Sequence, residues 1–248
     1  MKTEQKVIEV EGLVKRFGSF VANDHLTFDV YKGEIFGFLG ANGAGKTTAI
    51  RILCGLSRPT SGKVLVAGID AARNPEEIKK RIGYMSQRFS LYEDLTVTEN
   101  IELYGGIYGM RMKEIRTRTA DLLKRLDFGQ YGNTLIRSLP LGLRQKLAFA
   151  VAVFHDPDIV FLDEPTSGVD PITRRQFWEM IWETAARGIT VFVTTHYMDE
   201  AEYCDRVTIM SEGKIVALDT PAALRTSYGT ASIEELFVKI TRPKTAAV

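Results

Sequence analysis

The segment GANGAGKT, from Gly40 to Thr47, most constrains how this 248-residue chain can fold. It fits the pattern G-x-x-x-x-G-K-[ST] without a mismatch, follows the apolar run EIFGFLG and precedes the helix-like stretch TTAIRILCGL. Strand, glycine-rich loop and helix in this order form a phosphate-binding loop, because backbone N–H groups and the helix N-terminus surround the phosphate oxygens. A Cβ at the glycine positions would obstruct that curl of the backbone.

The loop predicts two ligands, ATP and Mg²⁺. We expect Lys46 to place its charge beside the β- and γ-phosphates, and the Thr47 hydroxyl to ligate the metal ion. The other residues of this region that we expect to contact the nucleotide are Gly40, Asn42, Gly43, Ala44, Gly45 and Thr48.

An acidic pair ends a predicted buried strand. The run DIVFLDE, from Asp158 to Glu164, is apolar between its acidic ends. We expect Asp163 to reach a Mg²⁺ ion held beside the phosphates. Its neighbour Glu164 is placed to orient or deprotonate the attacking water, so we predict a catalytic role for it.

The composition narrows the class of partner. Hydrophobic residues make up 45% of the chain and charged residues 25%, which suits a globular domain with a real core. A net charge of +1 gives no basic excess, so we expect no nucleic-acid partner. The apolar runs are shorter than the roughly 20 residues that span a bilayer. Cys54 and Cys204 fit no disulfide or zinc pattern. We therefore expect any membrane role to depend on a partner.

The order of predicted elements indicates an α/β fold. Residues before the phosphate loop alternate β-forming with polar residues, as antiparallel strands do. Residues from about 92 to 156 form a mostly helical pattern. Beyond them, the buried strands IVFLD and ITVFVTTH flank a helix that starts at Asp170-Pro171. Alternating strands and helices predict a parallel sheet with helices on its faces.

Five segments in this order resemble the ATP-binding subunit of an ABC transporter: GANGAGKT, YMSQRF, LPLGLRQ, FLDEPTSGVD and TTH. The resemblance covers nearly the whole chain, from VKRFGSF to about residue 218. It implies a phosphate-loop NTPase fold with a RecA-like α/β core, an antiparallel β-subdomain and a helical subdomain at about 92–156. The ATP-binding domain would occupy 1–225, and a helical tail would occupy 226–248.

The resemblance also implies roles for single residues. Phe17 falls where the family places an aromatic ring that stacks on adenine. Gln87 matches the glutamine that contacts Mg²⁺ or water and links the ATP site to the membrane subunit. His196 matches the histidine that contacts the γ-phosphate, and Asp170 matches a loop that contacts the opposite subunit. The implied catalytic set is Glu164, His196 and Gln87, and the implied metal-binding set is Thr47, Gln87 and Asp163.

The chain departs from the family in one motif. Where the family has LSGGQ, this chain has Leu139-Pro140-Leu141-Gly142-Leu143. Pro140 stands in place of the serine that would contact the γ-phosphate held by the other subunit, and it offers neither a hydroxyl nor an N–H group. Gly142 remains as an implied nucleotide-binding residue. Either a homodimer works with this signature, or a different ATP-binding domain, on another chain or in tandem on the same one, supplies an intact signature. The complete phosphate-loop side favours the second.

The resemblance implies a subunit that powers transport through ATP-dependent dimerisation. It would sit at the cytoplasmic face of the cell membrane, attached to a transmembrane permease. The segments FLDEPTSGVDP and TTHYMDEAEYCDR resemble exporters of drugs and other hydrophobic molecules. Three alternatives stay open: an importer subunit, a soluble ABC ATPase of translation or DNA repair, and a binding module that has lost hydrolysis.

Overall fold

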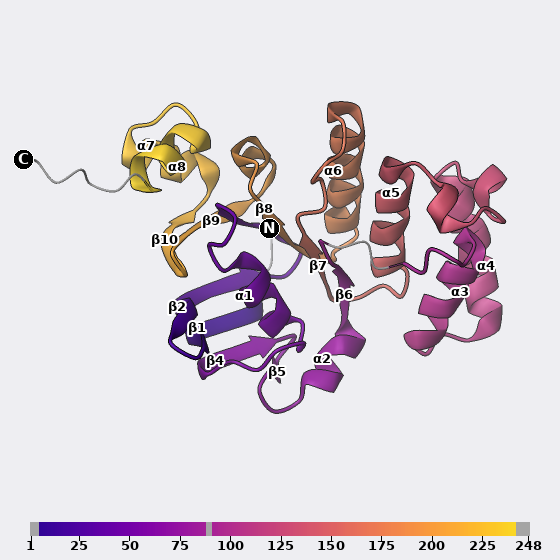
Figure 1. Ribbon diagram of the computed structural model, residues 1–248, viewed down its shortest axis with the longest axis horizontal. Helices are drawn as coiled ribbons and strands as arrows, with labels where there is room; N and C mark the ends of the chain where they lie inside the picture. The colour runs from indigo at the N-terminus through magenta and orange to yellow at the C-terminus, as the bar shows by residue number, and fades with distance from the viewer. Residues whose placement is uncertain (1–4, 88–90, 242–248) are drawn as a thin grey trace, which may run out of the picture.

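A six-stranded sheet lies at the centre of the computed structural model, which describes residues 5–87 and 91–241 (Figure 1). Its strand order is β10-β9-β3-β8-β7-β6, and every neighbouring pair is parallel except β9 with β10. The inner strands β3, β8 and β7 are buried at every residue, which accounts for the predominance of apolar and β-branched residues in them. The six strands are β3 (Ile35–Gly40), β6 (Ile82–Met85), β7 (Ile159–Asp163), β8 (Thr190–Thr195), β9 (Arg206–Ser211) and β10 (Lys214–Asp219).

The carboxyl ends of the parallel strands bring the predicted motifs together. β3 ends at Gly40 and β7 ends at Asp163, while β8 ends directly before His196 and β6 ends two residues before Gln87. Parallel strands point the same way, so these four positions lie along one edge of the sheet. Ligands of open α/β sheets bind at this edge.

A second, antiparallel sheet packs against the first through a helix. Its order is β2-β1-β4-β5, with strands β1 (Lys6–Phe17), β2 (Phe20–Tyr31), β4 (Ser61–Val66) and β5 (Ile69–Asp70). Helix α1 (Lys46–Leu53) contacts β2 and β4 of this sheet and β3 and β7 of the central one. The shared core contains a cluster of rings in which Phe28 from β2 packs on Phe36, Phe38 and Phe192. Burial of this aromatic surface fixes the N-terminal sheet beside the phosphate loop.

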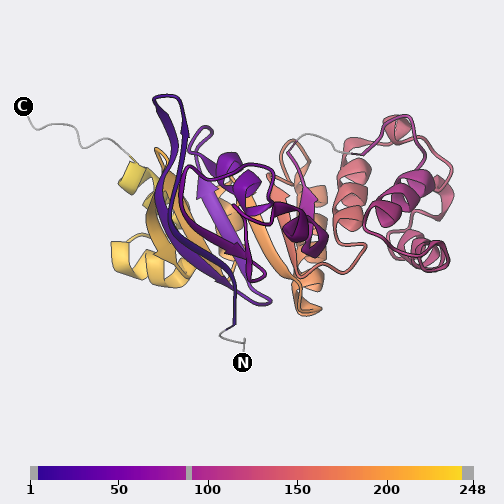
Figure 2. The same cartoon turned by 90° about the horizontal axis from the view of Figure 1, so that it is seen from below.

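A helical arm projects from the central sheet, on the right in Figures 1 and 2. It contains α3 (Val97–Ile107), α4 (Met112–Arg125), the short helices η1 (Gly129–Tyr131) and η2 (Ile136–Ser138), and α5 (Leu141–Ala152). Thr96 and Glu99 form a reciprocal capping box at the start of α3. Helix α5 packs against β6 and leads into β7. Asp156, between α5 and β7, pairs with Arg118 of α4 and with Arg187 after α6 (Pro171–Ala186). These contacts connect the arm to the core.

Two further helices lie at the opposite end of the molecule from the arm, shown in yellow in Figures 1 and 2. Thr220 caps α7 (Pro221–Tyr228), and Ser232 accepts the backbone N–H of Glu235 near the start of α8 (Ile233–Thr241). Helix α8 packs against η3 (Met198–Tyr203). Helix α7 runs across the expected domain boundary at residue 225, and residues 242–248 of the predicted tail lie outside the described residues.

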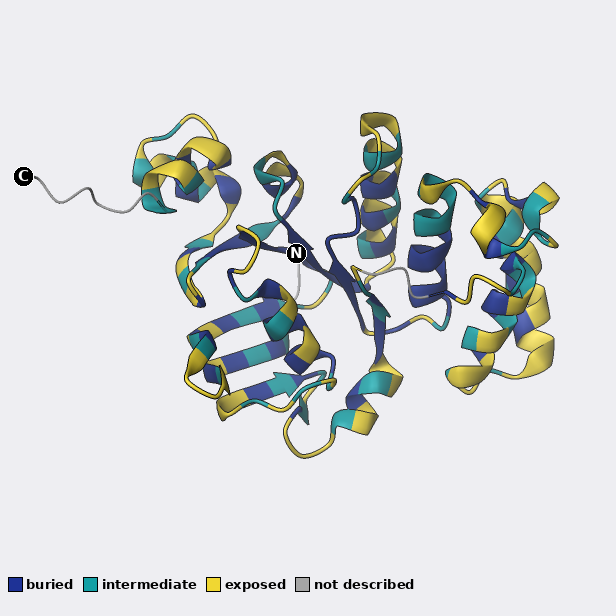
Figure 3. Cartoon of the chain, in the orientation of Figure 1, coloured by how far each residue is buried: buried dark blue, intermediate teal, exposed yellow. Residues whose placement is uncertain are grey.

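The architecture confirms the predicted fold class: a phosphate-loop α/β core, an antiparallel β-subdomain and a helical subdomain. The remaining helix, α2 (Pro75–Arg81), joins the two sheets through β5 and β6. Buried residues are concentrated along the central sheet and the helix faces that cover it (Figure 3). In the described part of the chain, no helix has both the length and the apolar character needed to cross a membrane.

Candidate active site

The phosphate loop is shaped by glycines that other residues could not replace. Gly45, directly before α1, has φ = 103°, and a Cβ there would lie 2.3 Å from the carbonyl oxygen of Ala22. Gly43 has φ = 82° and faces open space. Asn23 of β2 is fully buried, and its Nδ2 donates to the Gly45 carbonyl at 3.1 Å. Asn23 of the N-terminal sheet thus fixes one side of the loop. The other side, at Gly43, is open to an anion.

Lys46 is the buried cation of the loop. Its side chain is 4% exposed, and Nζ donates to the carbonyl oxygens of Gly40 at 2.7 Å and Ala41 at 3.2 Å. The same ammonium lies 3.3 Å from Oε1 of Glu164. A buried ammonium needs such partners, because removal from water without them would cost several kcal/mol (a rough general magnitude).

Glu164 is the residue on which the predicted catalytic set converges. It follows β7 directly and has φ = 50°, an uncommon conformation for a residue with a side chain. The backbone N–H donates to Thr194 Oγ1 at 3.0 Å, which stabilises this turn. While Oε1 faces Lys46, Oε2 accepts from Gln87 Nε2 at 3.1 Å and lies 3.1 Å from His196 Nδ1. Three loops from separate parts of the chain therefore meet on one carboxylate.

Asp163 offers a carboxylate oxygen that has no hydrogen-bond partner. Its Oδ1 accepts from Thr194 at 2.7 Å and from Thr47 at 3.4 Å, whereas the buried Oδ2 accepts from no described residue. Burial raises the pKa of the Asp163 carboxyl, and the neighbouring Glu164 adds to the rise, although the bonds from Thr194 and Thr47 oppose it. A carboxylate and a hydroxyl with a spare buried oxygen suit a hard divalent cation.

Phe17 lies apart from this cluster, at the end of β1. Its ring is 56% exposed, the ammonium of Lys15 sits 5.0 Å from its centroid, and Phe20 faces it across the hairpin. Phe17 is therefore not a core residue, and its exposed ring is accessible to a planar ligand.

The altered signature forms the start of α5. Pro140 is the residue before the helix and makes no side-chain cap, and the side chain of Leu141 is 43% exposed. Gly142 packs against the start of α6, because a Cβ there would lie 2.9 Å from Cγ2 of Thr173. Gly142 is therefore needed for the close approach of α5 to α6, whatever it contacts in a partner. Gln145, further along α5, donates to the Ser167 carbonyl at 3.2 Å.

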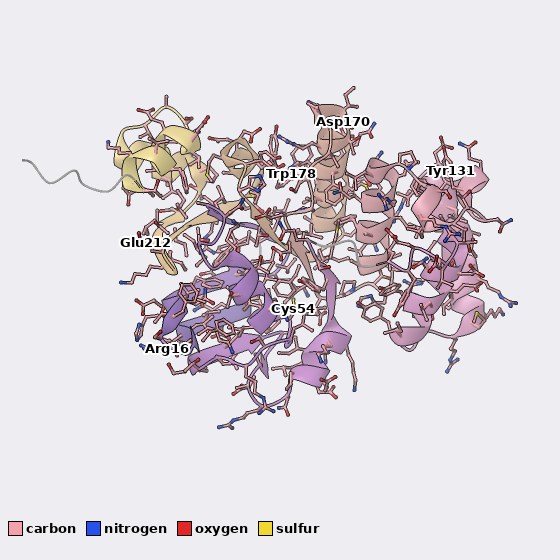
Figure 4. All side chains as sticks on the ribbon, in the orientation of Figure 1. Arg16, Cys54, Tyr131, Asp170, Trp178 and Glu212 are labelled. Atoms are coloured by element: carbon pink, nitrogen blue, oxygen red, sulfur yellow. The ribbon has the colours of Figure 1, made fainter. Side chains whose placement is uncertain are left out.

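Asp170 caps α6, as its sequence position predicts (Figure 4). Its side chain accepts from the backbone N–H groups of Ile172 and Thr173 at 3.0 Å and from the Thr173 hydroxyl at 2.6 Å. These bonds hold the pKa of the Asp170 carboxyl below its usual range, the Thr173 hydroxyl contributing most.

The structure gathers most of the predicted site residues at one edge of the sheet. Hydrogen bonds or ion pairs connect Lys46, Gln87, Glu164 and His196 in one group and Thr47 with Asp163 in a second group that Thr194 joins to the first. Among the described residues, no hydrogen bond or ion pair joins Phe17 or Gly142 to either group. Asn42 is exposed and Thr48 half-buried in the loop region.

Two residues that support the site were missed at the level of sequence. The Thr194 hydroxyl accepts the backbone N–H of Glu164 and donates to Asp163. In the sequence, only its place in the segment TTH pointed to this residue. Asn23 holds the phosphate loop from β2. An amide at an inward-facing strand position was a signal for it, because a buried amide needs a polar partner.

Comparison with known proteins identifies the family. The sequence pattern described as "ABC transporter" matches residues 23–167. The chain is 47% identical over 221 residues to the "Probable multidrug ABC transporter ATP-binding protein YbhF" of Escherichia coli K12, a match that covers 89% of this chain and 38% of that protein. The chain thus spans less than half the length of that relative. It is 38% identical to the "Daunorubicin resistance ATP-binding protein DrrA2" of Streptomyces coeruleorubidus, covering 92% of this chain and 71% of that one.

Solved structures agree in fold. One described as "Structure of ATP binding subunit of ABC transporter" has a TM-score of 0.86 at 30% identity, covering 94% of this chain and 99% of that one. Another, a post-hydrolysis dimer of the ATP-binding cassette MJ0796 bound to ADP and Pi, has a TM-score of 0.78 at 26% identity, covering 86% and 98%. From the site geometry and these matches together, we conclude that the chain belongs to the ABC transporter family, as an ATP-binding domain.

Proposed function

We propose that this chain powers an ABC exporter by hydrolysing Mg²⁺-ATP with Glu164 as the general base. The observation that carries the proposal is the convergence of Lys46, Gln87 and His196 on the Glu164 carboxylate. A base that takes a proton from water must be held in place, and these three contacts fix the position of the carboxylate. The proton of the attacking water passes to Glu164 as the water oxygen bonds to the γ-phosphorus. The bond from the γ-phosphorus to the β–γ bridging oxygen breaks in the same step, and ADP leaves with that oxygen.

The other residues bind and orient the phosphates. Backbone N–H groups of the loop and the start of α1 face the β- and γ-phosphates, and Lys46 exchanges its contact with Glu164 for contacts with their oxygens. His196 moves from Oε2 of Glu164 toward the γ-phosphate, and Gln87 holds the attacking water. The ring of Phe17 stacks on adenine.

A Mg²⁺ ion fits between Thr47 and Asp163. The unpartnered Oδ2 of Asp163 and the Thr47 hydroxyl would supply two oxygen ligands, and Gln87 donates to Glu164, the chain neighbour of Asp163. Such an ion would neutralise charge that develops on the phosphates during phosphoryl transfer, and it would offset the cost of burying the Asp163 carboxylate.

We further propose that the ATP held here is completed by the signature of a different ATP-binding domain. The phosphate-loop half of this chain has every residue that hydrolysis requires. Its signature half has Pro140, which lacks an N–H group, and the protruding side chain of Leu141. Two copies of this chain would each meet a poor signature, whereas a partner with an intact one would complete this site.

Export from the cytoplasmic face of the membrane, through a transmembrane permease, is the proposed use of the hydrolysis. The names of the relatives support export: one is a probable multidrug transporter protein, one a daunorubicin resistance protein, and a third, from Ralstonia nicotianae, is the "Nod factor export ATP-binding protein I", 37% identical and covered over 69% of its length. The exposed Gln87 is the site residue placed to sense a permease.

The test is ATP binding by a phosphate-loop variant. Lys46→Ala removes the buried ammonium and should weaken Mg²⁺-ATP binding by about a hundredfold in isothermal titration. Lys63→Ala is the matched control, because the Lys63 side chain is exposed on β4 and forms its ion pair with Glu11, away from the loop. Retained tight binding by Lys46→Ala would rule out the proposed site.

A further inference from the structure

A buried carboxylate outside the proposed catalytic set, that of Glu200, connects loops of the active site. Glu200 belongs to η3 and is fully buried. Its Oε1 accepts the Thr166 hydroxyl at 2.6 Å, and Arg174 Nε lies 3.7 Å from the same oxygen. Burial of a carboxylate costs free energy, so the position of Glu200 calls for an explanation beyond packing.

Glu200 connects three segments near the active site. Thr166 is two residues after Glu164, and Glu200 is four residues after His196. Arg174 is four residues after Asp170, so it lies one turn into α6 from the residue that caps this helix. One carboxylate therefore joins the base loop, the histidine loop and the start of α6.

A ring contact closes the connection on the side of the histidine. The guanidinium carbon of Arg174 lies 4.0 Å from the ring centroid of Tyr197, and this ring lies 4.2 Å from the ring of His196. A displacement of Arg174 would thus move the Tyr197 ring, which contacts the ring of His196.

The ion pair between Glu200 and Arg174 includes buried polar atoms that lack hydrogen bonds within the described part of the chain. Neither Oε2 of Glu200 nor Nε of Arg174 has a hydrogen-bond partner among the described residues, and both are buried. A shift of less than about 1 Å at the start of α6 would turn the 3.7 Å ion pair into a charge-assisted hydrogen bond. Such a shift also moves Asp170, because it lies on the same turn of the chain.

We infer that Glu200 is a positioning residue that sets His196 for the γ-phosphate by tying it to the Glu164 loop and to the start of α6. Glu200 touches no substrate atom and acts through Thr166 and Arg174. The inference rests on the proposed ATP site and adds that discrimination between ATP and ADP depends on this buried carboxylate.

The test measures how tightly the full chain binds two nucleotides, ATPγS and ADP, each with Mg²⁺. Glu200→Gln keeps the shape of the side chain and an oxygen for Thr166 but removes the buried one of the two carboxylate charges that face Arg174, the other being the exposed Asp199 at 3.9 Å. ATPγS affinity should fall about tenfold while ADP affinity stays within about twofold, because His196 contacts only the γ-phosphate. In a His196→Ala background the Glu200→Gln effect should vanish, since the group through which it acts is gone.

Two further variants keep the test decisive if Glu200→Gln folds poorly. Thr166→Val removes the hydroxyl with little change of shape and should reproduce the loss, whereas Thr166→Ser should retain wild-type discrimination. The matched control is Glu34→Gln, because Glu34 is another buried glutamate, paired with Arg206 at 3.2 Å at the start of β3, the far end of that strand from the phosphate loop. Its nucleotide affinities should not change.

An equal loss of ATPγS and ADP affinity in Glu200→Gln and Thr166→Val, or no loss of either, would overturn the inference and assign Glu200 to packing alone. These outcomes differ from failure of the proposed ATP site itself. If that site were wrong, Lys46→Ala would not change the affinity of the otherwise wild-type protein for ATPγS or ADP.

Discussion

Lys46 of the phosphate loop and Glu164 of the base loop form a buried ion pair, with Nζ 3.3 Å from Oε1 and side chains that are 4% and 6% exposed. Each group therefore neutralises the other before the phosphates of ATP arrive. In the proposed function phosphate oxygens take over Lys46, so nucleotide binding would release Oε1 of the Glu164 carboxylate from its ion pair.

Glu164→Gln should separate binding from hydrolysis. The amide keeps the size of the side chain but accepts no proton, so phosphate release should fall about a hundredfold while ATP affinity is kept or raised. Release is measured in a single-turnover assay with protein in excess over labelled ATP. Glu179→Gln, on the exposed side of α6, serves as the control and should keep the wild-type rate. Unchanged release in Glu164→Gln would remove Glu164 as the base.

Phe17→Ala should weaken binding of adenine nucleotides without affecting the fold. Loss of one stacking partner costs about tenfold in affinity, equally for ATP and ADP, because the ring contacts only the base. The melting temperature should stay within about 1 °C, since the side chain is 56% exposed. Phe20→Ala is the matched control across the hairpin, and a larger effect there than at Phe17 would reassign the stacking residue.

Asp163→Asn should abolish the benefit of Mg²⁺. In the wild type, Mg²⁺ with ATP should raise the melting temperature more than ATP with a chelator does, because the metal binds the buried Oδ2 and relieves the cost of its charge. In the variant, the two conditions should give the same melting temperature. A full Mg²⁺ effect in Asp163→Asn would place the metal on other ligands.

His155 should make the protein sensitive to mild acid. The ring stacks on Tyr108 with centroids 3.5 Å apart, and burial lowers the pKa of the imidazole to about 4 from its ordinary value of about 6.5. Since the folded state disfavours protonation, stability is fully present above about pH 6.5 and is lost as the pH falls toward 4.

The measurement for His155 is urea unfolding between pH 7 and pH 5, above the range where most carboxyl groups titrate. Wild-type stability should fall over this window, and His155→Phe, which keeps a ring on Tyr108, should show a flatter profile. An equally steep decline in His155→Phe would assign the acid sensitivity to other groups. His25→Phe, at an exposed position, is the control.

Local patterns predicted the fold and much of the site. The glycines and Lys46 follow from their spacing, because the loop conformation is set within a few residues. Asp163 and Glu164 follow from their place at the end of an apolar run, and the Asp170 cap follows from its position before Pro171. These features are fixed by neighbours in sequence.

Contacts between distant segments were not predictable in this way. Thr194 joins the two acidic residues from an adjacent strand, Asn23 supports the loop from another sheet, and Glu200 meets Thr166 across 34 positions. A lone threonine or glutamate has no periodic or motif signal, and only the folded topology decides its neighbours. The packing of Gly142 on Thr173 likewise depends on how α5 meets α6.

Restoring the signature tests the central claim, that this chain needs a signature from another ATP-binding domain. The comparison uses Glu164→Gln protein, which holds ATP without consuming it, with and without the further changes Pro140→Ser, Leu141→Gly and Leu143→Gln. Gly142 stays in both proteins, so its packing on Thr173 is preserved. Mass is measured by light scattering after size exclusion, with Mg²⁺-ATP and with Mg²⁺-ADP.

The protein with its native signature should remain a monomer that binds ATP, and the protein with the restored signature should dimerise with ATP but not with ADP. Dimerisation of the native-signature protein to the same extent would contradict the claim and make a homodimer of this chain the working unit.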